Sequence, residues 1–162
     1  MAAMNKREIL AAALAQMKAQ HAAALTSAEA TRAGAVHEEA KPENDKDTRA
    51  LEASYLARGQ AMRVEELGET IERLRFLPLK DYDGGVPVGL GALVTLEHET
   101  EQRRVLLVPV GGGLSLPSCE GEVALLSPAA PLGRALVGAV EGDEVELRVA
   151  GRPRIFELVR VR

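Results

Sequence analysis

The sequence predicts an α+β protein, in which an N-terminal antiparallel α-helical coiled-coil hairpin precedes a small antiparallel β-sheet domain with one short helix. From Met4 to Leu77 there is one proline, Pro42, and the helix-favouring residues Ala, Leu, Glu and Arg dominate. Apolar or small residues recur there in alternating steps of four and three, as in a coiled coil. From Asp83 onward Gly and Pro are frequent and Val and Leu cluster in short runs, which is typical of strands and turns.

Two long helices are expected, over about Asn5–Val36 and Asp47–Leu77. The apolar stripe of the first comprises Leu10, Leu14, Met17, His21, Ala24, Ala28, Thr31 and Ala35. The stripe of the second comprises Ala53, Ala57, Gln60, Val64, Leu67, Ile71 and Leu74. Each helix would be about 45 Å long, at about 1.5 Å per residue. Neither could bury its stripe alone, so we expect an antiparallel hairpin over residues 1–79 with the stripes packed together.

The turn of this hairpin is expected at residues 37–47. Pro42 cannot continue a helix, and Asn44 and Asp45 favour turns. The segment holds five carboxylates, which are Glu38, Glu39, Glu43, Asp45 and Asp47. One interpretation is a solvated charged turn. The other is a carboxylate cluster held at the end of a rod and delivered into the site of another protein, since carboxylates and water are the ligands that Mg²⁺ prefers.

A small β-rich domain is expected over residues 92–162, after a linker at 80–91 with some conformational freedom. Its strands are predicted at Ala92–Glu97, Arg104–Val110, Glu122–Leu126, Glu144–Val149 and Arg154–Val161. Between the third and fourth strands, Pro128–Val137 should contain a short helix that starts near Pro131 and ends at Gly138. A twisted antiparallel sheet with this helix against one face fits that order.

Composition excludes several kinds of function. Aromatic residues make up 2% of the chain and Trp is absent, which argues against base-stacking platforms. The net charge of −4 disfavours direct binding to phosphates as the default. Cys119 is the only cysteine, so neither an internal disulfide nor a cysteine-based zinc site can form. The first 14 residues lack the pattern of a signal peptide and no apolar run could span a bilayer, so we expect a cytoplasmic protein without membrane contact.

The C-terminal half carries a motif that resembles one in the Gre-type bacterial transcription elongation factors, the GreA/GreB family. The motif reads Ser127-Pro128, then Leu132-Gly133-Arg134-Ala135-Leu136-Val137-Gly138, then Gly142-Asp143-Glu144-Val145. The closing run Ile155–Val161 and the pair Glu43-Asn44 at the expected turn are also similar to that family. The resemblance covers the whole chain and implies an FKBP-like fold for the C-terminal domain.

This sequence departs from the family pattern at three places. Ala129-Ala130-Pro131 is inserted between the Ser-Pro pair and the helix, and Ala139 stands where the family often has lysine. At the tip, the family's aspartate three residues before the glutamate falls on Ala40. Substitutes for that aspartate are available among the neighbouring acidic residues Glu39, Glu38, Asp45 and Asp47.

The resemblance implies an accessory factor and not an enzyme. Gre factors enter the secondary channel of RNA polymerase, where the C-terminal domain docks on the rim and the tip carboxylates support Mg²⁺-dependent cleavage of backtracked RNA. The expected partners are therefore RNA polymerase and, within that complex, the 3′ end of the nascent RNA. No cofactor of its own and no metal stably bound by the free protein are expected, because the Mg²⁺ is shared with the polymerase active site. A monomer is expected.

The resemblance also assigns roles to particular residues. The carboxylates expected to assist the polymerase Mg²⁺ are Glu43 first, then Glu39, then Glu38, Asp45 and Asp47. The cations expected to touch RNA or the channel wall, unless they serve solubility alone, are Lys41, Lys46 and Arg49. The residues expected to dock on the polymerase are Ser127, Pro128, Leu132 and Arg134. For Leu132, internal packing is an equally open interpretation.

Three alternatives remain open at this point. The first is a Gre-fold regulator that binds the secondary channel without stimulating cleavage, as the altered tip suggests. The second is an FKBP-like prolyl isomerase, which needs a pocket lined by aromatic rings, whereas the C-terminal half offers Phe156 alone. The third is a generic coiled-coil interaction module, against which the Ser-Pro to Gly-Asp motif argues.

Overall fold

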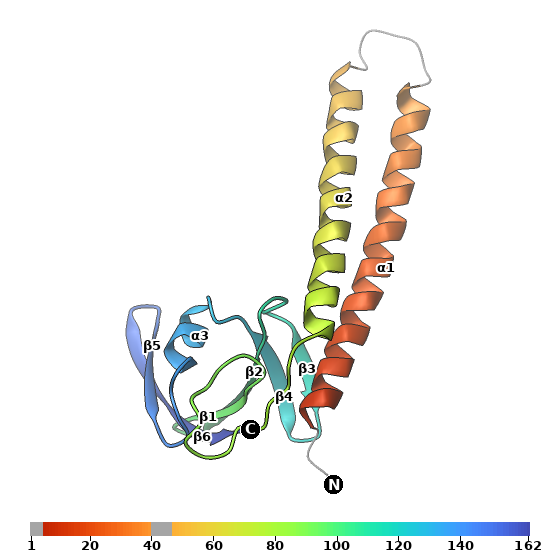
Figure 1. Ribbon diagram of the computed structural model, residues 1–162. Coiled ribbons are helices and arrows are strands. Elements are labelled where there is room, and N and C mark those ends of the chain that lie inside the picture. Colours follow the sequence, from red (N-terminus) through yellow and green to blue (C-terminus); the bar gives the residue numbers. More distant parts are fainter. Residues whose placement is uncertain (1–4, 40–46) are drawn as a thin grey trace. The chain divides into compact units, whose positions relative to one another are not determined.

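The computed structural model describes residues 5–39 and 47–162 (Figure 1). Of Ala35, His37–Glu39 and Asp47 it describes the backbone alone. The chain divides into two compact units, Ala15–Glu72 and a second unit that joins Met1–Leu14 to Arg73–Arg162. In the part of the chain that the structure covers, no helix is both long enough and apolar enough to cross a membrane.

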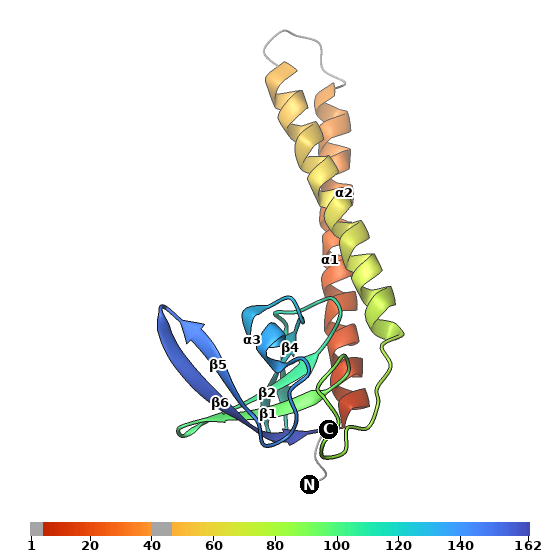
Figure 2. The same ribbon diagram turned by 60° about the vertical axis from the view of Figure 1, so that its left-hand side comes forward.

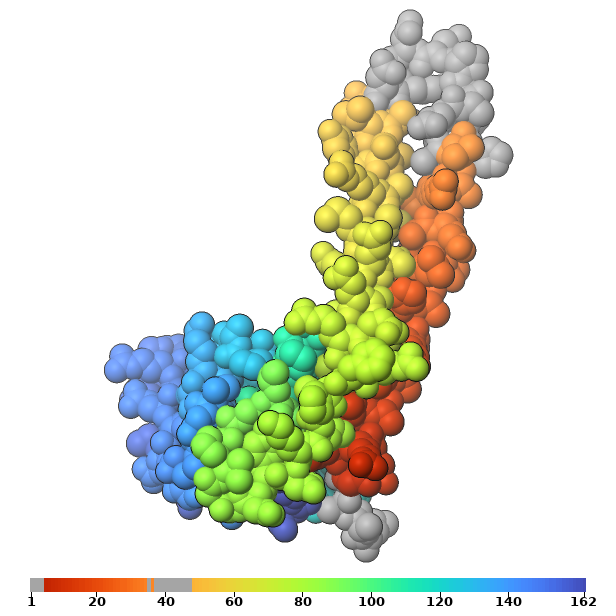
Figure 3. Space-filling view, in the orientation of Figure 1, coloured from red at the N-terminus to blue at the C-terminus, as the bar shows by residue number. Residues whose placement is uncertain are grey.

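The unit Ala15–Glu72 is an antiparallel pair of helices, taken from α1 (Lys6–Glu39) and α2 (Asp47–Arg75) (Figures 1, 2 and 3). The stripes predicted from the sequence are confirmed, because their residues are buried or partly buried while most of their neighbours are exposed. In this unit these are Met17, His21, Ala24, Ala28, Thr31, Ala53, Ala57, Gln60, Val64, Leu67 and Ile71. Small residues along this seam let the two helices approach closely.

The unit around the sheet contains six strands in the order β3-β4-β2-β1-β6-β5. The strands are β1 (Leu93–His98), β2 (Glu101–Leu107), β3 (Ser115–Ser118), β4 (Gly121–Leu126), β5 (Glu144–Val149) and β6 (Arg152–Val161). All neighbouring strands are antiparallel except β2 and β4, which are parallel, so the sheet is mixed. The parallel pair arises because β3, which the sequence analysis missed, forms a hairpin with β4 that folds back beside β2. A four-residue edge strand containing Pro117 gives almost no sequence signal.

Two turns are tighter than the sequence suggested. Ala150 and Gly151 alone connect β5 to β6, and both have positive φ angles, of 50° and 78°. Such two-residue turns match the twist of the flanking strands. Arg152 and Pro153 were expected in the turn but lie in β6, where Pro153 pairs with Arg148. Likewise β2 begins at Glu101, three residues before the predicted start.

The core of this unit lies between the sheet and α3 (Pro131–Leu136) (Figure 2). Its largest fully buried side chains are those of Phe156, Leu96, Leu107, Leu136 and Leu158, each at most 1% exposed. The segment expected to be a linker contributes to it, since Tyr82 and Val88 are buried there. Its backbone is bonded as well: Val88 N donates to Ala139 O at 2.8 Å, and Gly138 N donates to Val88 O at 2.9 Å. From Tyr82 onward this segment is part of the folded unit.

Candidate interaction surfaces at the hairpin tip and around α3

The acidic segment predicted from the sequence includes the last residues of α1 and the first residue of α2. α1 ends with Glu38 and Glu39, and α2 begins at Asp47, so the antiparallel pairing brings these three backbone positions to the same end of the hairpin (Figure 1). Arg49 is exposed in the first turn of α2. The other tip residues singled out from the sequence lie outside the described residues; they are Lys41, Glu43, Asp45 and Lys46. Among the residues that are described, no three His, Cys, Asp or Glu side chains are grouped to hold a metal ion.

The Ser127-Pro128 pair forms a turn that sets the start of α3. Ser127 Oγ accepts a hydrogen bond from Ala129 N at 3.2 Å, and Ser127 O accepts one from Ala130 N at 3.0 Å. Pro131 then occupies the first position of the helix, where its missing N–H costs nothing. The insertion Ala129-Ala130-Pro131 is thus accommodated as turn and helix start.

The four predicted docking residues have different surroundings. Arg134 is exposed on α3, and Ser127 and Pro128 are partly buried in the turn before it. Leu132 is 9% exposed and belongs to the core. Internal packing, which the sequence left open for Leu132, is therefore what the structure shows. The three other residues remain accessible around α3.

A groove of about 450 Å³ lies beside α3, over the strands β2, β3 and β4. Its floor is apolar and its rim is charged with both signs. The lining residues are Glu101, Gln102, Arg103, Arg104, Val105, Ser115, Glu122, Ala124, Leu126 and Leu132. None of these is aromatic, so the groove lacks the rings that a prolyl-isomerase pocket needs. An apolar floor with a polar rim is the usual anatomy of a protein–protein contact surface.

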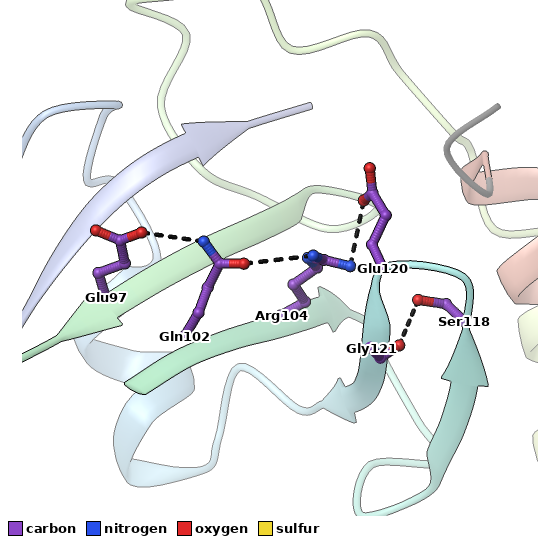
Figure 4. A network of polar contacts seen from close by, with 6 residues as sticks. All are labelled: Glu97, Gln102, Arg104, Ser118, Glu120 and Gly121. Carbon is purple, nitrogen blue, oxygen red and sulfur yellow. Dashed lines mark hydrogen bonds and ion pairs between the residues drawn. The ribbon is translucent and has the colours of Figure 1, made fainter. Parts of the chain in front are cut away.

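A chain of polar contacts ties the strands at this groove together (Figure 4). Gln102 Nε2 donates to Glu97 Oε1 at 3.0 Å, and Arg104 Nη2 donates to Gln102 Oε1 at 3.3 Å. Arg104 Nη1 lies 3.2 Å from Glu120 Oε2, an ion pair without the alignment of a hydrogen bond. The Arg104 side chain is only 14% exposed. Because little water reaches it, Glu120 and Gln102 supply the polar contacts that stabilise its charge. The Arg104–Glu120 ion pair could not be predicted from the sequence, because it depends on the parallel pairing of β2 with β4.

The rim of the groove carries a carboxylate that stays ionised. Arg103 Nε donates to Glu101 Oε1 at 2.8 Å, and Arg154 Nη1 lies 3.9 Å from Glu101 Oε2. The hydrogen bond from Arg103, reinforced by the positive charge, lowers the pKa of Glu101 below its ordinary value. The rim therefore presents fixed charges near neutral pH.

Comparison with known proteins identifies the family. A scan against models of protein families gives no match. The chain is 33% identical over 100 residues to the transcription elongation factor GreA of Jannaschia sp. (strain CCS1), and the matched residues cover 61% of this chain and 60% of that protein. It is 30% identical over 118 residues to GreA of Brucella anthropi, and here the matched residues cover 72% of this chain and 69% of that protein. The chain belongs to the GreA family of transcription elongation factors.

The matched residues cover only part of each of the relatives named first, and the similarity to solved structures is low. The chain matches about three fifths of the length of the Jannaschia relative and 62% of a Cereibacter sphaeroides GreA, to which it is 34% identical. Among solved structures, the transcription factor Gfh1 is 22% identical with a TM-score of 0.42, covering 93% of this chain and 94% of that one. GreA/GreB from Nitrosomonas europaea is 23% identical with a TM-score of 0.37, covering 59% of this chain and 78% of that one.

Proposed function

We propose that this chain enters the secondary channel of RNA polymerase and that its tip carboxylates support Mg²⁺-dependent cleavage of backtracked nascent RNA. Membership of the GreA family carries this proposal, together with one observation of the chain itself. The antiparallel pairing of α1 and α2 brings Glu39 and Asp47, which precede and follow Glu43 in the sequence, to the same end of the hairpin. The acidic segment is thus the part of the hairpin that would enter a channel first.

The chemistry would be that of the polymerase, and this chain would add oxygen ligands. Two-metal phosphoryl-transfer sites stabilise the attacking and leaving oxygens, and Mg²⁺ is commonly held by only one or two protein carboxylates. We infer that Glu43 supplies one such carboxylate. Glu39 is the first substitute for the family's aspartate, with Glu38, Asp45 and Asp47 as further candidates. The protein then acts as an accessory factor without turnover of its own.

The sheet-containing unit would hold the factor on the polymerase. Ser127, Pro128 and Arg134 surround the start of α3, and the groove beside it has an apolar floor formed in part by Ala124 and Leu126. Such a surface suits a protein segment better than RNA, because its rim carries carboxylates as well as arginines. Contacts to RNA or to the channel wall would instead come from the tip cations, which are Lys41, Lys46 and Arg49.

RNA cleavage in a stalled, backtracked elongation complex tests the proposal. The wild-type chain should shorten the RNA, and Glu43→Gln, which keeps the size of the side chain, should slow cleavage by about tenfold or more while binding is retained. Glu39→Gln tests the substitute carboxylate in the same way. A matched control is Glu69→Gln, because Glu69 is exposed on α2 but lies far along the helix from the tip. Equal loss in the control would contradict the assignment to the tip.

The second candidate is a secondary-channel regulator that does not stimulate cleavage. It is favoured by Ala40, which stands where the family has an aspartate. The same experiment separates the two functions. If the wild-type chain binds the polymerase but leaves the RNA intact, the regulatory function stands and its effect should appear in initiation or pausing assays.

A further inference from the structure

An exposed face of α2 carries a second apolar stripe that the hairpin does not use. Leu51 is 58% exposed, Tyr55 is 67% exposed and Met62 is 52% exposed. With Arg58, also exposed, they follow one another in steps of four, three and four. These steps keep the four side chains within about 60° around the helix axis, on the side roughly opposite the seam that faces α1. Large apolar side chains gathered on a face without a partner commonly mark an interaction surface.

We propose that this face of α2 binds the same face of a second copy of the chain, with the two α2 helices antiparallel around a two-fold axis. The spacing four, three, four reads identically in both directions. Antiparallel pairing therefore sets Leu51 against Met62 of the second copy, and Tyr55 against Arg58 of the second copy. Each contact then occurs twice, as a two-fold interface requires.

The chemistry of the facing residues is complementary in this register. Leu51 and Met62 are both apolar, and an arginine guanidinium beside a tyrosine ring is a favourable cation–π pair. Glu52 and Arg63 directly follow Leu51 and Met62, share one flank of the stripe and are both exposed. The same register brings Glu52 close to Arg63 of the second copy, with a shift along the axis of about 3 Å that long side chains can span.

This self-complementarity favours a second copy over an unrelated partner, which would not require a stripe that reads the same in both directions. The stripe has four residues a side, which is small compared with interfaces of standard size. We therefore expect weak, concentration-dependent association with a dissociation constant in the micromolar range. The inference departs from the monomer expected from the sequence, and it does not depend on the proposed function.

Sedimentation velocity over a range of concentrations tests the dimer. The wild-type chain should shift from monomer to dimer as concentration rises. Tyr55→Arg sets two arginines against each other and should weaken association by about tenfold or more. The exchanged variant Tyr55→Arg/Arg58→Tyr restores the pair across the axis and should recover most of the loss. A wild-type chain that stays monomeric at every concentration overturns the proposal, as does failure of the exchanged variant to recover.

Leu56→Arg is the matched control. Leu56 is 57% exposed and adjacent to Tyr55, but it lies more than about 90° from the stripe around the helix. This variant should dimerise like the wild-type chain. Equal weakening by Leu56→Arg would show general hydrophobic association and would overturn the specific face. Far-ultraviolet circular dichroism confirms that each variant remains helical.

Disulfide trapping tests the antiparallel register. In a Cys119→Ser background, which removes the only native thiol, Leu51→Cys and Met62→Cys are made in separate chains. Mixing the two chains under oxidation should give a covalent dimer, because a disulfide requires β-carbons about 4 Å apart. Each chain alone should give little. Cross-linking of the Leu51→Cys chain with itself in preference to the mixture would indicate parallel pairing and would overturn the proposal.

Discussion

The α-carbon of Gly133 lies directly against the carbonyl group of Ser127. A β-carbon built on Gly133 would overlap the carbonyl oxygen of Ser127 and would come within 3.0 Å of the α-carbon of Pro128. The Ser-Pro turn and α3 are therefore in backbone contact, and only glycine fits between them. This contact gives a physical reason for the glycine in the motif Ser127-Pro128 to Gly133.

Replacement of Gly133 by alanine should destabilise the sheet-containing unit. The added methyl group meets backbone atoms of Ser127 and Pro128, which cannot rotate away as a side chain could. Relief requires α3 to move off the core, and overpacking of this kind typically costs about 1–3 kcal/mol. Urea unfolding of Gly133→Ala beside the wild-type chain measures the cost. A free energy of unfolding equal to that of the wild-type chain would contradict the close contact.

The same substitution in the hairpin should have the opposite effect. Gly34 and Gly59 lie within α1 and α2, and a β-carbon at either position would meet no atom within 4 Å other than those of the adjoining residues and of the helix's own backbone. Gly59→Ala should stabilise α2 by about 0.5–1 kcal/mol, because alanine loses less backbone entropy in a helix. Thermal melting followed by circular dichroism at 222 nm (the usual helix wavelength) reports the change. A lower melting temperature would reveal a contact at Gly59 that the structure does not show.

Tyr82 should make stability fall at alkaline pH. Its hydroxyl donates to Leu90 O at 2.9 Å, and burial raises the pKa of Tyr82 above its ordinary value of 10.0. Because the folded-state pKa is the higher one, this contribution is fully present below pH 10.0 and is lost as pH rises through the folded-state value. Tyr82→Phe should lose about 1 kcal/mol at neutral pH, through the missing hydrogen bond. The variant should also show a shallower decline above pH 10.0 when urea unfolding is measured across that range.

If α3 and its turn form the docking surface, Arg134→Glu should weaken binding to RNA polymerase by about tenfold without changing the stability of the free protein. Arg134 is exposed, so the substitution leaves the core intact. Arg148→Glu is the control, since Arg148 lies on β5 with 77% of its side chain exposed. Binding of fluorescently labelled protein to the core polymerase distinguishes them. Equal weakening by both variants would indicate loss of general charge attraction rather than of a specific contact.

Much of the fold can be predicted from the sequence, because local patterns determine it. The seams of α1 and α2 follow from the four-three spacing, which the burial of Met17 and Ile71 confirms. The start of α3 at Pro131 follows from the preference of proline for the first helical position. Gly138, with a φ of 86°, lies just beyond the helix as expected.

What the sequence did not reveal depends on long-range pairing. The parallel contact of β2 with β4 joins segments that no local pattern relates, and β3 is too short to be recognised. The Arg104–Glu120 ion pair and the groove beside α3 follow from that pairing, so neither could be foreseen. Pro153 is misleading for another reason: proline usually interrupts strands, yet here it lies next to a two-residue turn in a terminal hairpin. The roles of the tip carboxylates remain predictions.

The position of β6 has a consequence for the order in which the protein folds as it is synthesised. β6 pairs with β1 on one side and with β5 on the other, so β1 keeps an open edge until Arg152–Val161 has been made. The helical hairpin, by contrast, needs only the first half of the sequence. A nascent chain that stops before Arg152 would expose an unpaired strand edge, which is a template for aggregation. The sheet can therefore be completed only after nearly all of this chain has emerged from the ribosome.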